Sequence, residues 1–170
     1  LPEAINKLRS GQALLAASGS GDALWWARST QALGNTLRRD GQLHSAHEQL
    51  LQSLGWQERR EPPSLVDKLV VEGNLAAVES WSGDFRSAAA RLERVHRELR
   101  ARLGPLHSRS LAAATELAYA QLRLGRFDEA RRLADDLIAA VGGAAEQQRA
   151  SEFMELVLAR FRDMGMELEP

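Results

Sequence analysis

The sequence contains no cysteine, which excludes disulfides, a thiol nucleophile and cysteine-ligated zinc and leaves the redox compartment open. It also has no apolar run approaching the roughly 20 residues that a membrane-spanning helix requires. Neither charge is in excess, because 22 Lys and Arg are balanced by 23 Asp and Glu. Proteins that bind nucleic acid through bulk electrostatics usually have a strong basic excess. The charge balance therefore argues against a nucleic-acid partner. We also expect a cytoplasmic protein with no membrane partner.

Aromatic residues make up only 5% of the chain, and β-branched residues are scarce. Ala, Leu, Arg, Glu and Gln dominate instead, and all of these favour helices. Apolar residues recur at steps of three and four, as in Leu111, Ala114, Leu117, Ala120 and Leu124. No alternating stretch of strand length competes with this pattern. The sequence therefore predicts an all-α protein.

Turn-forming residues separate the periodic runs and set the expected helix limits. Asp22 and Ser64 each precede an apolar run and are expected to cap a helix, and Ser108 is expected to take the same role later. The expected helices are 2–17, 22–40, 43–57, 64–82, 84–102, 108–124, 127–141 and 144–164.

The sequence repeats itself with a period of 42 residues, marked by Gly41, Gly83 and Gly125. Glycine after a helix indicates a left-handed turn, so each unit is expected to be a helix–turn–helix hairpin. Small residues before and after the glycine allow the two helices to approach closely, and neighbouring hairpins must stack to bury their apolar faces. The columns are Leu33, Leu75 and Leu117, then Gly34, Ala76 and Ala118, and after the turn Ala46, Ala88 and Ala130. One period earlier, Ala4 and Leu8 fall in the columns of Ala46 and Leu50, so the chain is expected to start inside a truncated repeat.

These columns resemble the tetratricopeptide repeat (TPR) family, with Leu-Gly or Leu-Ala in the first helix and Gly-x-aromatic-x-x-Ala across the turn. The long period and the linker at residues 103–112 are similar to the kinesin light chain-like variant common in bacterial proteins. The resemblance implies a right-handed superhelical α-solenoid that forms a single domain over residues 1–170. Its expected parts are a second helix of a truncated repeat (1–18), three repeats (22–57, 64–103 and 107–141) and a capping helix (144–165).

No segment of the sequence predicts catalysis. Residues 18–22 are rich in glycine but have neither a preceding strand nor a Walker lysine, so we interpret them as a turn. His44 and His47 are three apart on one predicted helix and could share a metal ion, but no third ligand has suitable spacing. His107 is expected to hydrogen-bond the backbone of its linker. We expect no catalytic residue, no metal and no cofactor, and hence no enzyme.

The resemblance also implies where a ligand binds, because first helices line the concave surface of TPR arrays. Arginine offers a two-pronged donor to carboxylates, asparagine pairs with peptide amides, and exposed aromatics anchor interfaces. Two alternatives to peptide binding remain open. The arginines contact only solvent on the surface of their helix, or they bind the phosphates of a nucleic acid. The residues expected in the groove are Arg28, Gln31, Asn35, Arg38, Arg39, Trp81, Tyr119 and Arg123.

The expected function is that of a non-catalytic scaffold that binds a peptide or partner segment with acidic or C-terminal carboxylate features in this groove. The alternative is a regulatory or ligand-sensing module excised from a larger bacterial transcription regulator or Ser/Thr kinase. A further expectation is a homodimer formed through the apolar face of the N-terminal half-repeat. That face comprises Leu1, Ala4, Ile5, Leu8 and Leu15.

Overall fold

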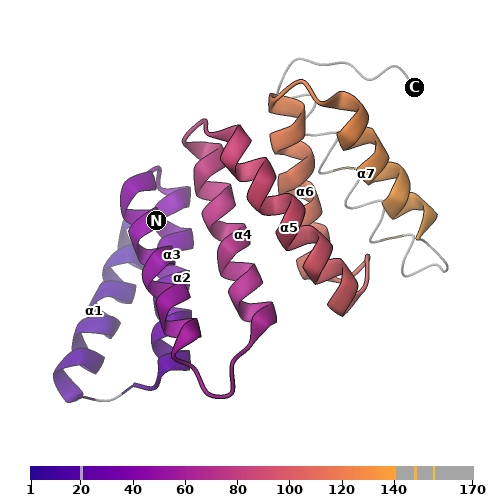
Figure 1. Cartoon of the computed structure of the whole chain (residues 1–170). Coiled ribbons are helices and arrows are strands. Elements are labelled where there is room, and N and C mark those ends of the chain that lie inside the picture. Colours follow the sequence, from indigo (N-terminus) through magenta and orange to yellow (C-terminus); the bar gives the residue numbers. More distant parts are fainter. Residues whose placement is uncertain (20, 141–147, 149–154, 156–170) are drawn as a thin grey trace. The chain divides into compact units, whose positions relative to one another are not determined.

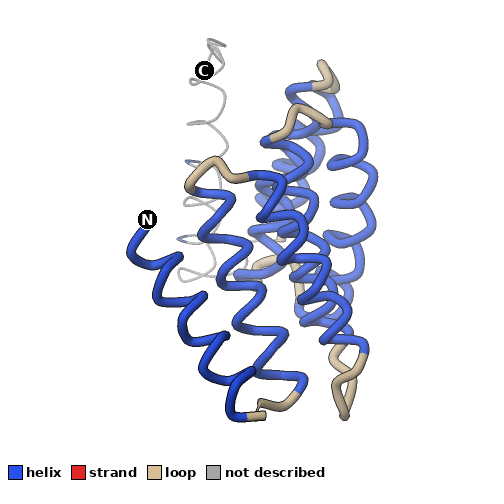
Figure 2. Tube along the Cα trace, turned by 90° about the vertical axis from the view of Figure 1, so that its left-hand side faces the viewer, coloured by secondary structure: helices blue, strands red, loops and turns tan. Residues whose placement is uncertain are grey.

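The computed structural model describes residues 1–19 and 21–140, together with Gln148 and Glu155. Within this part of the chain every regular element is an α-helix (Figure 2), which confirms the all-α prediction. The helices are α1 (Pro2–Ser18), α2 (Ala23–Arg39), α3 (Leu43–Glu58), α4 (Leu65–Trp81), α5 (Phe85–Leu103), α6 (Ser108–Arg123) and α7 (Phe127–Ala139) (Figure 1).

The chain divides into two compact units, Leu1–Gly83 and Asp84–Pro170. In the first unit α1 packs on α2, α2 on α3, and α3 on α4, whereas in the second α5 packs on α6 and α6 on α7. The expected capping helix falls outside the described residues, apart from Gln148 and Glu155. The single domain and its repeat limits remain predictions.

The helix starts follow the predicted capping residues at two of three positions. The side chain of Asp22 accepts a hydrogen bond from the Trp25 backbone at 2.8 Å, and Ser64 caps α4 in the same way. The prediction for Ser108 is wrong. That residue is already helical, and His107, whose backbone is extended, accepts from the Arg109 backbone through Nδ1 at 3.1 Å. The expectation that His107 bonds the linker backbone is confirmed.

The turn glycines adopt the left-handed conformation that the repeat predicts, with φ of 79° at Gly41 and 73° at Gly125. The same pair of hydrogen bonds closes both helices. After α2, Gly41 donates to Arg38 and Gln42 to Leu37, and the equivalent two bonds recur after α6. This is the Schellman arrangement, in which glycine is favoured because a Cβ atom would be strained.

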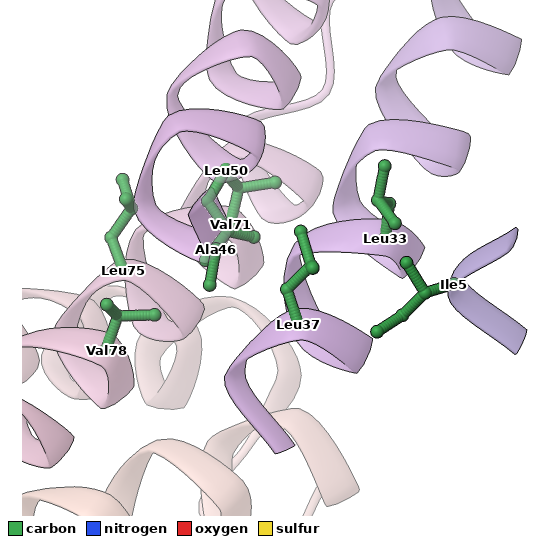
Figure 3. Close-up of a cluster of buried hydrophobic side chains, with 8 residues drawn as sticks. All are labelled: Ile5, Leu33, Leu37, Ala46, Leu50, Val71, Leu75 and Val78. Carbon is green, nitrogen blue, oxygen red and sulfur yellow. The ribbon is translucent and has the colours of Figure 1, made fainter. Parts of the chain in front are cut away.

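The core of the first unit is an apolar cluster shared by its four helices (Figure 3). Gly34 lets α2 approach α3: a Cβ atom at this position would lie 2.8 Å from Cγ of Leu50 and 3.2 Å from the backbone oxygen of Ala46. The close approach predicted for these columns is therefore confirmed in this hairpin. The buried members of the cluster are Ile5, Leu33, Leu37, Ala46, Leu50, Val71, Leu75 and Val78.

Helix α1 differs from the sequence expectation in one respect. Ile5 is only 3% exposed and points toward Leu33 and Leu37 (Figure 3), and Leu8 packs against the same cluster. The expectation that both residues belong to an exposed face is therefore wrong. A second helix in such an array also packs on the first helix of the next repeat, and Ile5 lies on that side. Leu1 and Ala4 are exposed as expected.

Candidate interaction surfaces

One face of α2 is exposed and basic. Trp25, Arg28, Ala32 and Arg39 recur at helical spacing and are exposed, whereas Ala27, Thr30, Leu33, Gly34 and Leu37 are buried on the other side. No acidic residue occurs between Ala23 and Arg39. This face therefore offers positive charge without an acidic neighbour on its own helix.

The structure brings two predicted groove residues together from different helices of the first unit. The Arg38 guanidinium of α2 lies 5.4 Å from the ring centroid of Trp81 at the end of α4. Trp81 remains 48% exposed, and Arg38 is half-buried. A cation–π contact of this kind at an exposed site contributes about 0.5–1 kcal/mol. It holds an indole and a guanidinium beside the basic face of α2.

Asn35 and Gln31 lie on the same helix and are half-buried. The side-chain oxygen of Asn35 is buried and has no hydrogen-bond partner among the described residues. An amide oxygen in this state is a ready acceptor for a backbone N–H of a bound segment. The polar residues of α2 can thus contact both charges and peptide groups.

The remaining two groove residues form a second cluster, in the second unit. The Arg123 guanidinium donates to the hydroxyl of Tyr119 at 3.0 Å and lies 4.3 Å from the ring centroid of Phe85. The rings of Phe85 and Tyr119 meet edge to face at 6.0 Å. Sequence reasoning placed Tyr119 and Arg123 at a surface but missed Phe85, although its position two residues after a turn glycine is the aromatic column of the repeat.

The adjacent tryptophans Trp25 and Trp26 point in different directions, as helical geometry predicts. Trp26 is half-buried and stacks on Trp56 of α3, with centroids 5.8 Å apart. Trp25 is 42% exposed and meets Trp26 edge-on. Sequence reasoning left open which of the two is exposed and did not assign Trp25 to the groove, although its three-residue step to Arg28 places it on the basic face.

The histidines do not assemble a metal centre in the described part of the chain, where no group of three potential ligands occurs. His44 lies 3.4 Å from Glu48, its neighbour one helical turn away. His96 is buried between α5 and α6, where Nδ1 lies 3.3 Å from the Ser110 carbonyl oxygen. Burial lowers the pKa of His96, and the contact with Ser110 opposes this only in part.

The helices of this chain are arranged similarly to those of helical-repeat proteins whose structures have been solved. One is a protein of Podosopora anserina described as a kinesin light chain with nearly identical TPR-like repeats. It is 26% identical, with a TM-score of 0.64 over 87% of this chain and 68% of that chain. A second structure of this kind, from the same organism, is 22% identical, with a TM-score of 0.58 over 90% of this chain and 66% of that chain. No family model and no curated protein matches the sequence.

The chain thus has the TPR-like repeat architecture, and the resemblance seen in the sequence is confirmed. This architecture is in general that of a protein-interaction scaffold, because stacked hairpins present extended surfaces to a partner. Across the described residues, none of the helices is both long enough and apolar enough to cross a membrane.

Proposed function

We propose that the chain is a non-catalytic scaffold that binds an acidic peptide or partner segment along α2 and the end of α4. The observation that carries this proposal is the contact between Arg38 and Trp81, two residues 43 positions apart in the sequence. They meet beside a helix face whose only charges are arginines. An aromatic anchor next to guanidinium groups is the composition of an interface hot spot.

Each group on this surface has a defined role toward such a ligand. Arg28 and Arg39 are exposed and can each form a two-pronged contact with a carboxylate, either a side chain or a chain terminus. The free acceptor of Asn35 takes a backbone N–H of an extended segment. Trp81 takes an apolar side chain of the ligand, and Arg38 fixes the orientation of its indole.

The Tyr119 and Arg123 cluster supports the same kind of binding in the second unit. Arg123 is exposed and is held over Phe85 by its hydrogen bond to Tyr119, so its guanidinium is oriented before a ligand arrives. Preorganised side chains lose less conformational entropy on binding. We propose this cluster as a second contact site for an acidic partner.

The test is capture of peptides from a library whose members end in acidic residues or in neutral amides. The double variant Arg28→Glu and Arg39→Glu reverses two exposed charges on α2. Hydrogen bonds to charged groups contribute about 1.5–3 kcal/mol each, so we expect at least a tenfold loss of affinity for the captured acidic peptides. Trp81→Ala is expected to weaken the same peptides.

The matched control reverses two exposed arginines on other helices, Arg9 of α1 and Arg97 of α5, and therefore changes net charge equally. We expect this control to bind like the wild type, apart from a small general electrostatic effect. Equal loss in both double variants, or unchanged capture by the α2 variant, would reject the proposed surface.

A further inference from the structure

His96 is a buried titratable side chain of the second unit that the proposed surface does not use. It lies on α5 against α6, is 6% exposed, and its Nδ1 atom is 3.3 Å from the carbonyl oxygen of Ser110. A carbonyl oxygen only accepts, so Nδ1 carries the proton of the neutral ring. The other nitrogen, Nε2, is buried and has no hydrogen-bond partner among the described residues. The neutral ring therefore fits its site, whereas a proton added to Nε2 finds no acceptor there.

The charges around His96 offset each other. Arg100 of α5 disfavours the charged ring and Asp136 of α7 favours it, but these two groups bind each other at 3.1 Å. The α6 helix faces the ring with Ser110, which is neutral. Burial lowers the pKa of His96 more strongly than any of these contacts shifts it. Protonation therefore places a poorly compensated positive charge between α5 and α6.

The contact site formed by Phe85, Tyr119 and Arg123 spans the same two helices. Phe85 belongs to α5, about three helical turns before His96, whereas Tyr119 and Arg123 belong to α6. The Arg123 guanidinium lies 4.3 Å from the Phe85 ring centroid, and the centroids of the Phe85 and Tyr119 rings are 6.0 Å apart. Packed helices shift as rigid elements when their interface changes. The contact site therefore exists only while α5 stays packed on α6.

We propose that protonation of His96 loosens the packing of α5 on α6 and separates Phe85 from Arg123, so that this contact site is lost in acid. The surface along α2 belongs to the first unit, so it is expected to keep its geometry. The consequence for a ligand rests on the proposed function, whereas the structural change is a property of the free chain.

The composition of the chain provides a separate reporter for each unit. Tyr119 is the only tyrosine, and all four tryptophans belong to the first unit. Fluorine NMR of the full chain labelled with fluorotyrosine therefore observes the contact site, while tryptophan fluorescence observes the first unit. As the pH is lowered from about 7.5 to about 5, we expect a second Tyr119 signal to replace the first, with a midpoint below the ordinary histidine pKa of 6.5. Tryptophan fluorescence is expected to show no unfolding of the first unit.

Four variants assign the change to His96. His96→Gln removes the titrating group and is expected to abolish the second signal, whereas His44→Gln, at an exposed position of α3, is expected to leave it. Asp136→Asn removes a negative charge that favours the protonated ring, so the midpoint is expected to move to lower pH. Asp135→Asn changes net charge equally at the neighbouring exposed position and is expected to leave the midpoint in place. Circular dichroism checks that each variant remains helical.

Binding is measured on the Arg28→Glu and Arg39→Glu variant, which retains this contact site for acidic peptides. We expect acid to weaken its peptide binding by about fivefold or more, and the loss to disappear when His96→Gln is added. Absence of peptide binding at every pH would contradict the proposed function at this site, whereas the fluorine spectra of the free chain would still decide the switch. A Tyr119 signal that does not change with pH overturns the switch. So does a change that persists in His96→Gln, or one that coincides with unfolding of the first unit, because that result indicates general acid unfolding.

Discussion

Replacement of Gly34 by alanine tests the closest helix approach in the first unit. At a position within a helix where the added methyl group has free space, replacing glycine by alanine stabilises the folded protein, because alanine is favoured over glycine by about 1 kcal/mol. At Gly34 the added Cβ would lie 2.8 Å from Cγ and 3.0 Å from Cδ2 of Leu50. Leu50 is fully buried and Ala46 contributes backbone on the same side, so neither can move aside without disturbing the core.

The two effects have opposite signs, and the packing term is the larger. Forcing an extra methyl into a filled core costs about 1–3 kcal/mol. Subtracting the helix preference leaves a net loss of about 1 kcal/mol for Gly34→Ala. The control is Gly55→Ala in α3, where a Cβ meets no atom within 4 Å. Gly55→Ala is expected to raise the free energy of unfolding by about 0.5–1 kcal/mol. The free energies of unfolding of the two variants should therefore differ by about 2 kcal/mol.

Urea unfolding followed by circular dichroism measures both variants on the same chain. A double variant adds a second check. Leu50→Ala alone is expected to cost about 2–5 kcal/mol, but combined with Gly34→Ala the loss should be smaller than the sum, because the new methyl enters the space that the leucine leaves. If Gly34→Ala stabilises the chain as much as Gly55→Ala does, the close approach of α2 and α3 is refuted.

Three further predictions use the same unfolding measurements. Asp22→Ala removes the cap of α2 and should cost about 1 kcal/mol, whereas Asp22→Asn, which keeps an acceptor oxygen, should cost less. Ser53→Ala removes the buried bond from α3 to the Ala27 carbonyl and should cost about 1 kcal/mol; no change would mean that this bond adds nothing to the hairpin. Because burial lowers the pKa of His96, the unfolded chain binds more protons than the folded chain just below the ordinary value of 6.5. The contribution of neutral His96 is therefore fully present above that pH and is lost as the pH falls toward the lowered pKa. His96→Gln should flatten this slope in unfolding curves measured across the window, and an unchanged slope would assign it to other groups.

Most of the fold could be predicted because the same helix–turn–helix pattern occurs three times in the sequence. Gly41 and Gly125 mark turns that the structure closes with the same two hydrogen bonds, and the small column at Gly34 marks a real helix contact. The prediction of the residue that caps α6 was wrong because two neighbouring residues have side chains that can accept the capping hydrogen bond. His107 and Ser108 are both able to cap a helix, and only the extended backbone at His107 decides between them.

The candidate surface could be predicted in part. The resemblance to TPR arrays placed Arg38 and Trp81 in one groove, and the structure brings them into contact. The same resemblance did not place Trp25 and Phe85 there. Trp25 is exposed because its neighbour Trp26 stacks on Trp56, a pairing between helices that no local spacing shows.

The sequence by itself determined the helices, their turns and the repeat, because capping, glycine conformation and apolar periodicity act over a few residues and recur every 42. Only the tertiary structure decided which of the residues expected to be exposed are in fact buried. Ile5 is buried although its helix starts the chain, while Ala4 beside it is exposed. The physical reason is that burial depends on which neighbouring helix reaches each side, and that is settled by packing between segments distant in the sequence.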